Sequence, residues 1–289
     1  MIFDSQRFFT HGCLIYDDVL GATLQDREVK EEHTLLAWYE DDEWDLVGDP
    51  LDWATIGLVR PDEKQPQLLA LSPDGEACVF SGKGVEFEQI PDELEAPLTG
   101  LGVVNNKVYA VGMGYQVWRR DAPGDWKLIN NGDPDEPVGF THIHGFGTRD
   151  LYAVGWSGAI WRYKAKKWGP ETSPTQETLG HVCCASDGKV YACGSNGALL
   201  EGRDGKWKQV DLGEAKDNLW SLVEYEGAIY CSGEFGVFRL GPNGIESPDF
   251  GEDELTFREL SVAGGCLCSV GEEDILVFDG EDWSAIPVR

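Results

Sequence analysis

The chain has 289 residues, of which 42% are apolar and 11% are aromatic, enough to bury the core of one large domain. Its 52 acidic residues outnumber its 23 basic ones and give a formal charge of −29, which argues against binding to nucleic acid and against docking on anionic membranes. This charge favours a basic protein partner, or serves to keep a repeat protein soluble.

Targeting signals and metal motifs are not evident in the sequence. No stretch approaches the roughly 20 apolar residues of a membrane span, and the first twelve residues, MIFDSQRFFTHG, lack a basic segment followed by an apolar one. None of the eight cysteines forms a CxxC pair of the kind that binds zinc. We therefore expect a cytoplasmic protein with reduced thiols and no cofactor.

One short phrase returns along the chain at intervals of 43, 39, 39 and 38 residues. It reads VYAVG at 108–112, LYAVG at 151–155, VYACG at 190–194, IYCSG at 229–233 and LCSVG at 267–271. An apolar residue, usually Trp, follows each phrase, and the same marker falls upstream on Trp44 and Phe87. Self-similarity with a period near 40 residues is typical of solenoids and propellers.

In chain order, the repeats divide the sequence into seven units, at residues 1–50, 51–93, 94–132, 133–175, 176–215, 216–254 and 255–289. Within the fifth unit, the segments LGHVCCAS, KVYACG, ALLEGR and WKQV have the composition of strands, and DG, SNG and DGK separate them as turns. Such frequent turns exclude a helical solenoid. The sequence therefore predicts an all-β fold, a seven-bladed β-propeller with four antiparallel strands per blade, in a single domain.

The position of each residue type within the unit follows from this architecture. Each repeated phrase is predicted to be the second strand of a blade, and the following Trp begins the outer fourth strand. The tyrosines at 109, 152, 191 and 230 are predicted to fill the core between blades. The first unit is less regular, and we expect the ring to close by packing and pairing of the first and last blades.

The repeat resembles those of the Ycf48-like propellers, the photosystem II assembly-factor type, and of the wider BNR/Asp-box group. The resemblance rests on Leu151–Gly155, Gly158–Arg162 and Trp168, and on the same pattern from Val190 to Trp207. It implies the propeller fold. A full Asp-box reads Ser-x-Asp-x-Gly-x-Thr-Trp, and only RDGKW and FDGEDW remain here. The sialidases in that group use an arginine cluster, a tyrosine nucleophile and an acid, and we cannot place this set in the sequence. The photosynthetic assembly factors are exported before they act, and this N-terminus does not encode an export signal.

We predict that a partner binds the face that carries the loops between blades and the turns between second and third strands. Aromatic and apolar residues surrounded by acids are common in protein-binding surfaces, although the same residues can simply cover blade tops and solvate loops. The predicted contact residues are Trp156, Phe235, Met113, Tyr115, Asp92, Glu93, Asp133, Asp135, Glu136, Glu234, Glu252, Asp253, Glu272, Glu273 and Asp274.

The tripeptide HIH places His142 and His144 on one face of a strand, where two imidazoles can begin a metal site. A third ligand is needed, and no unit offers an obvious one. We expect satisfied polar residues here, and no metal site. The sequence also contains no Gly-rich phosphate loop before a helix and no Gly-x-Ser-x-Gly motif, so no catalytic residues are predicted.

These features together favour a non-catalytic propeller that binds another protein. The more specific hypothesis is an acidic immunity protein that neutralises a basic toxin, such as an effector of a type VI or contact-dependent secretion system, by covering its active site. Charge complementarity would accelerate the capture. Two alternatives stay open: an assembly or scaffolding factor of the Ycf48-like kind, and a glycan-binding or sialidase-like propeller with clustered Arg and carboxylates in an axial pocket.

Overall fold

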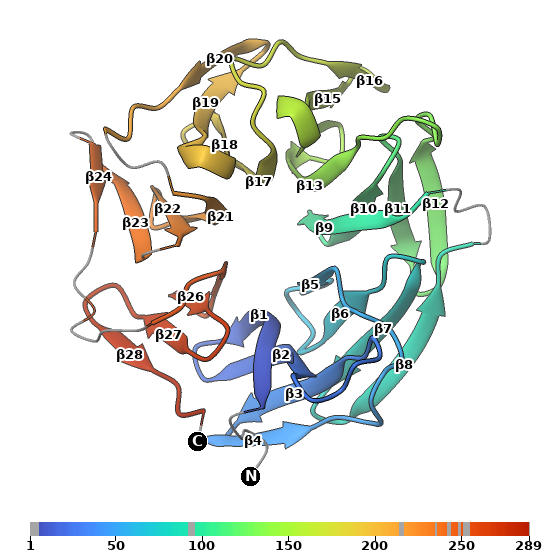
Figure 1. The fold of residues 1–289 in the computed structure, drawn as a ribbon, viewed down its shortest axis with the longest axis vertical. Coiled ribbons are helices and arrows are strands. Elements are labelled where there is room, and N and C mark those ends of the chain that lie inside the picture. Colours follow the sequence, from blue (N-terminus) through green and yellow to red (C-terminus); the bar gives the residue numbers. More distant parts are fainter. Residues whose placement is uncertain are drawn as a thin grey trace.

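Seven four-stranded antiparallel sheets stand around a central axis in the computed structural model, like the blades of a propeller (Figure 1). The structure describes residues 6–91, 96–213, 217–234, 236–241, 244–247, 250 and 255–288. Each sheet consists of four strands that are consecutive in sequence, so the predicted seven-bladed fold is confirmed. The described helices are two short 3-10 turns, η1 (Trp156–Gly158) and η2 (Ser195–Gly197), and none is long and apolar enough to cross a membrane.

In the first four blades, the strands are β1 (Arg7–Tyr16), β2 (Val19–Asp26), β3 (Leu35–Glu40), β4 (Glu43–Leu46); β5 (Gly57–Val59), β6 (Leu68–Leu71), β7 (Glu76–Ser81), β8 (Gly84–Gln89); β9 (Leu98–Val104), β10 (Lys107–Gly112), β11 (Val117–Ala122), β12 (Asp125–Asn130); β13 (Phe140–Gly147), β14 (Asp150–Gly155), β15 (Ile160–Lys164) and β16 (Lys167–Pro170). In the last three, they are β17 (Leu179–Cys184), β18 (Val190–Gly194), β19 (Leu199–Arg203), β20 (Lys206–Gln209); β21 (Leu219–Tyr225), β22 (Ala228–Gly233), β23 (Gly236–Gly241), β24 (Gly244–Glu246); β25 (Glu259–Ala263), β26 (Cys266–Val270), β27 (Ile275–Phe278) and β28 (Trp283–Ala285).

The repeated phrase forms the second strand of a blade, and the marker Trp falls in the fourth strand, as the sequence predicts. The turns between first and second strands have the expected positive φ, for example 51° and 56° at Asn105 and Asn106. The four repeat tyrosines are buried and pack between adjacent blades; Tyr109, for example, contacts a cluster that includes Phe140 of the next blade. Most of the core therefore lies between sheets that neighbour each other in the ring.

The propeller has two faces that differ in which connections they carry. The upper face, as named here, carries the loops between blades and the turns between second and third strands. These segments are bonded to one another: the N–H of Trp156 donates to the carbonyl oxygen of Gly139 at 3.2 Å, and that of Gly197 to Asp217 at 2.9 Å. The lower face carries the turns between first and second strands and between third and fourth strands.

Within the described residues, the first and last blades share no strand, so the predicted strand pairing between them is wrong. Among the described residues, β1–β4 form one sheet and β25–β28 another, because the N-terminal segment supplies its own inner strand β1. Packing does join the blades, in a cluster that includes Leu14 and Cys268. One backbone hydrogen bond, from Phe9 N–H to the Glu272 carbonyl at 2.8 Å, and one from Trp44 Nε1 to the Pro287 carbonyl at 3.0 Å cross the seam.

Candidate functional site

The inner strands enclose an axial cavity of about 1020 Å³. Its wall runs from Thr99 and Gly180 near the upper face to Asn106 and Gly264 in the turns of the lower face. A volume of this size is within the range of small-molecule sites, so the chemistry of the wall decides what the cavity can do.

Side chains of the cavity wall hydrogen-bond to backbone N–H groups of the next blade in the ring. His142 Nδ1 accepts from Val182 at 3.3 Å, and His144 Nδ1 accepts from Cys184 at 2.8 Å. At the seam between last and first blades, Glu259 and Ser261 occupy the equivalent places. Their side chains accept from the backbone N–H groups of Gly12 at 2.9 Å and Leu14 at 3.0 Å. These residues link inner strands whose edges would otherwise leave N–H groups unpaired.

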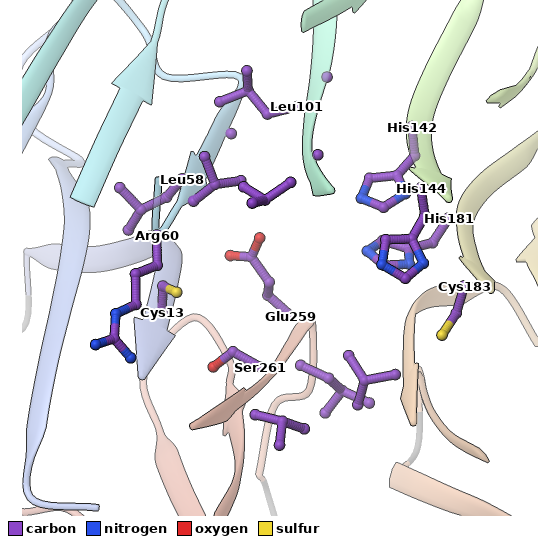
Figure 2. Close-up of a pocket in the computed structure, with 18 of the residues that line it drawn as sticks. Cys13, Leu58, Arg60, Leu101, His142, His144, His181, Cys183, Glu259 and Ser261 are labelled. Atoms are coloured by element: carbon purple, nitrogen blue, oxygen red, sulfur yellow. The ribbon is translucent and has the colours of Figure 1, made fainter. Parts of the chain in front are cut away.

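Three histidines lie together on one side of the cavity (Figure 2). The rings of His142 and His181 stack with centroids 3.6 Å apart. Burial in the wall lowers the pKa of His144 to about 4 and that of His181 to about 3, and it lowers the pKa of His142 as well. The imidazoles are therefore neutral at physiological pH, and in this state His142 and His144 accept the backbone hydrogen bonds at Nδ1.

The tautomer of these rings opposes metal binding. A neutral ring that accepts at Nδ1 carries its proton on Nε2, the atom that would have to bind a metal, whereas metal-bound histidines usually donate their other ring N–H to an acceptor. Within the part of the chain that the structure describes, no three His, Cys, Asp or Glu side chains are arranged to hold an ion. His142 and His144 are linking residues of the inner strands, and His181 is a third imidazole that the sequence reasoning did not connect with them.

The opposite side of the cavity carries a carboxylate and an arginine, both already paired. His11 Nδ1 lies 3.4 Å from Glu259 Oε2. Burial alone would lower the pKa of His11, but Glu259 outweighs it and the pKa is raised. Arg60 donates to the carbonyl oxygens of Ile15, at 2.6 Å, and Glu63, and its guanidinium lies over the Tyr16 ring. Arg60 is the one arginine among the described lining residues, so the arginine cluster that a sialidase-like site requires is not formed there.

The predicted contact residues on the upper face differ in how exposed they are. Trp156 and Met113 are half-buried in turns of the upper face. Tyr115, at φ 63°, stacks its ring on Trp161 at 5.1 Å and meets Phe140 edge-on at 5.0 Å, so the structure places it in the packing between the third and fourth blades. Asp92, Glu93, Phe235, Glu252 and Asp253 lie outside the described residues.

The predicted acids that the structure describes form two groups. Asp133, Asp135, Glu136 and Glu234 are exposed, and no ion pair holds them within the described residues. Those of the last blade already have partners. Glu272 lies 2.7 Å from Arg258 and 3.8 Å from Arg27, and Glu273 lies 3.0 Å from Arg27. Asp274 accepts from the backbone N–H of Thr256 at 3.0 Å and from its hydroxyl at 3.1 Å.

One aromatic residue of the upper face was missed by the sequence reasoning. Trp220, at the start of the inner strand β21, is 45% exposed. The aligned places in the first, third and fourth blades are Thr10, Thr99 and Thr141. A tryptophan at a position that holds threonine in three other blades was a usable signal, but finding it requires the register of the inner strands.

The chain is 34% identical to the immune protein Tsi7 of Pseudomonas aeruginosa, over 95% of each chain. The chain belongs to the Tsi7 family of immunity proteins. No family model matches it. The immunity-protein hypothesis is thereby confirmed.

Solved structures share the fold at low sequence identity. Ycf48 bound to a D1 peptide aligns with a TM-score of 0.69 and 11% identity, over 96% of this chain and 93% of that one. The WD40 propeller domain of Doa1 aligns with a TM-score of 0.74 and 10% identity, over 97% and 95%. The resemblance to Ycf48-like propellers holds at the level of the fold, and the Asp-box assignment receives no support from these matches.

Proposed function

We propose that this protein neutralises a toxin without catalysing a reaction, by binding it and covering its active site. The observation that carries the proposal is the 34% identity with the immune protein Tsi7 along nearly the whole chain. The cavity wall supports a binding role, because His142 and His144 accept backbone hydrogen bonds at Nδ1 and Glu259 is bonded to Gly12. Groups committed to linking the blades are poor candidates for a general base.

The toxin is proposed to be basic and to bind the upper face. The exposed acids Asp133, Asp135, Glu136 and Glu234 face solvent there without cationic partners among the described residues. Cations gather instead at the lower turns of the fourth and fifth blades. Nine of the 23 Lys and Arg residues fall there: Arg149, Arg162, Lys164, Lys166, Lys167, Lys189, Arg203, Lys206 and Lys208. Carboxylates without cationic partners on the upper face attract a basic protein and help to orient it during the encounter.

The proposed location is the cytoplasm, where an immunity protein would intercept a toxin before it acts. All eight cysteines are free, and most are buried. Burial raises the pKa of the Cys13, Cys78 and Cys183 thiols to about 12, so these thiols resist oxidation and disulfide exchange. Free thiols in this number are typical of a reducing compartment.

The direct test uses a candidate toxic effector from the genome that encodes this protein. We expect co-expression to abolish its toxicity, and the purified pair to form a 1:1 complex in which the effector's activity is lost in proportion to the protein added. Toxicity that persists despite stable expression of this protein, together with no complex at micromolar concentrations, would refute the proposed function.

A further inference from the structure

The inner strands share a β-bulge near their upper ends. The register of pairing with the second strand shifts around Thr10, Thr99, Thr141, Gly180 and Trp220 in five of the blades. A bulge leaves one residue unpaired and redirects its side chain. The same bulge in five blades makes the side chains at this place directly comparable.

Threonine at the bulge joins neighbouring strands. The Thr141 hydroxyl donates to the carbonyl oxygen of Leu179 in the next blade at 2.5 Å and to that of Val154 at 3.1 Å. The Thr99 hydroxyl bonds to the carbonyl oxygens of Phe140 and Val111 in the same way. A small side chain with a hydroxyl group at the bulge is therefore enough to join the neighbouring strands.

Trp220 departs from this pattern. Its indole is 45% exposed and has neither a hydrogen bond nor an aromatic partner among the described residues. An exposed aromatic ring that the fold does not require is a typical anchor of a protein interface. The packing of the sixth blade alone does not account for tryptophan here.

A notch lies next to Trp220. In the preceding blade the bulge residue is Gly180, and a methyl group added there would find its nearest neighbour, the Trp220 carbonyl oxygen, 3.8 Å away. Gly180 also lines the axial cavity, so the notch opens at the upper mouth of that cavity. Strands β17 and β21, which carry the two residues, are neighbours in the ring (Figure 1).

The surroundings of the notch are acidic. Glu177 and Asp217 lie in the loops that enter β17 and β21, and the turn at Asn196 and Gly197 bonds to both loops. Arg258 precedes Glu259 in the seventh blade, at the place equivalent to Trp220, and lies 2.7 Å from Glu272. Acidic residues therefore precede both strands, with the Glu177 carboxylate accepting from Asn196 Nδ2 at 2.7 Å, and the Trp220 residue is exposed between them and the cavity mouth.

We propose that Trp220 and the Gly180 notch receive an arginine side chain of the basic partner at the upper mouth of the cavity. This deepens the proposed function and rests on it. A guanidinium stacks flat on an indole and bonds to carboxylates at the same time, whereas an ammonium group makes a point contact. The atoms nearest to a side chain at Gly180 are backbone carbonyl oxygens, which can accept hydrogen bonds from the guanidinium group.

The test uses variants that restore what other blades contain. Trp220→Thr places the residue of three other bulges in the sixth blade, and Gly180→Thr adds a side chain whose Cβ would lie at an ordinary van der Waals distance from its neighbours. Phe87→Thr is the matched control, because Phe87 is 69% exposed but lies on the outer strand β8. Circular dichroism and thermal unfolding check that each variant is folded.

The probe is a fluorescein-labelled heptaarginine peptide in 150 mM NaCl, with dissociation constants from fluorescence anisotropy. We expect Trp220→Thr and Gly180→Thr each to weaken binding about 5- to 20-fold, with Phe87→Thr within about 2-fold of the unaltered protein. Heptalysine should bind more weakly, and its affinity should change less with Trp220→Thr.

A fourth variant separates this inference from the proposed function. Asp133→Asn, Asp135→Asn and Glu136→Gln together remove charge from the upper face and leave the notch intact. Equal heptaarginine affinity in the Trp220, Gly180 and Phe87 variants overturns the arginine anchor. If the acid variant nonetheless binds heptaarginine more weakly, the acids of the upper face attract cationic peptides, and the arginine contact at Trp220 is still refuted. If the acid variant also binds unchanged, the proposed upper-face interaction fails as well.

Discussion

The lower turns of the fourth and fifth blades and the acidic loops of the upper face use charge in different ways. At the lower turns, acids and bases are interlaced: Arg162 bonds both oxygens of Asp150 at 2.8 and 3.0 Å and also bonds Asp204, and Lys164 lies 2.9 Å from Asp204. These cations hold the pKa of Asp204 far below its usual range. On the upper face, Asp133, Asp135 and Glu136 face water without such partners among the described residues.

The difference separates charges that hold the fold together from charges that are available to a partner. A buried cation with fixed carboxylate partners cannot be removed without leaving uncompensated charge, whereas a solvated carboxylate costs little to lose. We therefore expect the lower network and the cavity wall to control stability, and the upper acids to control association.

The largest effect on stability is expected for Arg162→Met. Only 7% of the Arg162 side chain is exposed, and its loss leaves Asp150 and Asp204 facing each other without their main cation. We expect the free energy of unfolding to fall by about 3 kcal/mol. Urea unfolding measures this, with Lys166→Met as control, since Lys166 is exposed in the turn after the Arg162 strand and no ion pair holds it within the described residues. A loss for Arg162→Met no greater than for the control would show that the network does not support the fold.

The cavity histidines are expected to make the fold sensitive to acid. The pKa values of His144 and His181 are lowered in the folded state, so their contribution to stability is complete above about pH 6.5 and is lost as the pH falls toward 4. When the pH falls from 7.5 to 5, each of these two histidines should lower the free energy of unfolding by about 2 kcal/mol.

The measurement is urea unfolding at both pH values for His144→Gln, whose side-chain oxygen can still accept the Cys184 N–H. This variant should lose less stability on acidification than the unaltered protein. His33→Gln, outside the cavity, is the matched control and should behave like the unaltered protein. An identical pH dependence in all three proteins would contradict the assignment of a neutral, buried His144.

A smaller effect is expected where the ring closes. Ser261→Ala leaves the Leu14 N–H without its acceptor, at a seam that no shared strand reinforces. We expect a loss of about 1 kcal/mol in unfolding free energy, accompanied by faster hydrogen exchange at Leu14. Protection of that amide unchanged by the substitution would mean that the Ser261 hydrogen bond does not stabilise the seam.

The smallest effect on stability is expected on the upper face. Neutralising Asp133, Asp135 and Glu136 together should change the unfolding free energy by less than about 0.5 kcal/mol, because these side chains are solvated. Thermal and urea unfolding measure this. A loss of more than about 1 kcal/mol would show that these acids take part in the fold, which would weaken the contrast between the two faces.

Much of the fold could be predicted from the sequence because propeller blades are built from local signals. Turn pairs such as Asn105–Asn106, the repeated phrase and the spaced tryptophans each reflect contacts within a blade or with the next one. The packing of the first blade on the last was predicted correctly, but their strand pairing was not, since whether β1 completes its own sheet depends on the irregular first unit. The role of His142 and His144 depends on the register between inner strands of separate blades, which spacing within one strand does not reveal.

The candidate interface was harder to predict for the same reason. Residues in turns, such as Trp156, are visible as departures from the repeat, but their exposure depends on the loops that fold beside them. Tyr115 looked like a surface aromatic and instead stacks on Trp161. Trp220 lies inside a strand, and it becomes conspicuous only when its bulge is aligned with those at Thr10, Thr99 and Thr141.

The central claim is that the upper face captures a basic toxin by charge. Its most direct test is the association rate constant with the candidate effector from the same genome, measured by stopped flow at 50 and 300 mM NaCl. Removing Asp133, Asp135 and Glu136 should slow association about 10-fold at low salt, and the difference should shrink at high salt. Neutralising Lys166, Lys167 and Lys206 on the lower face should leave the rate unchanged or raise it. A rate that falls with the lower lysines and not with the upper acids would contradict the account.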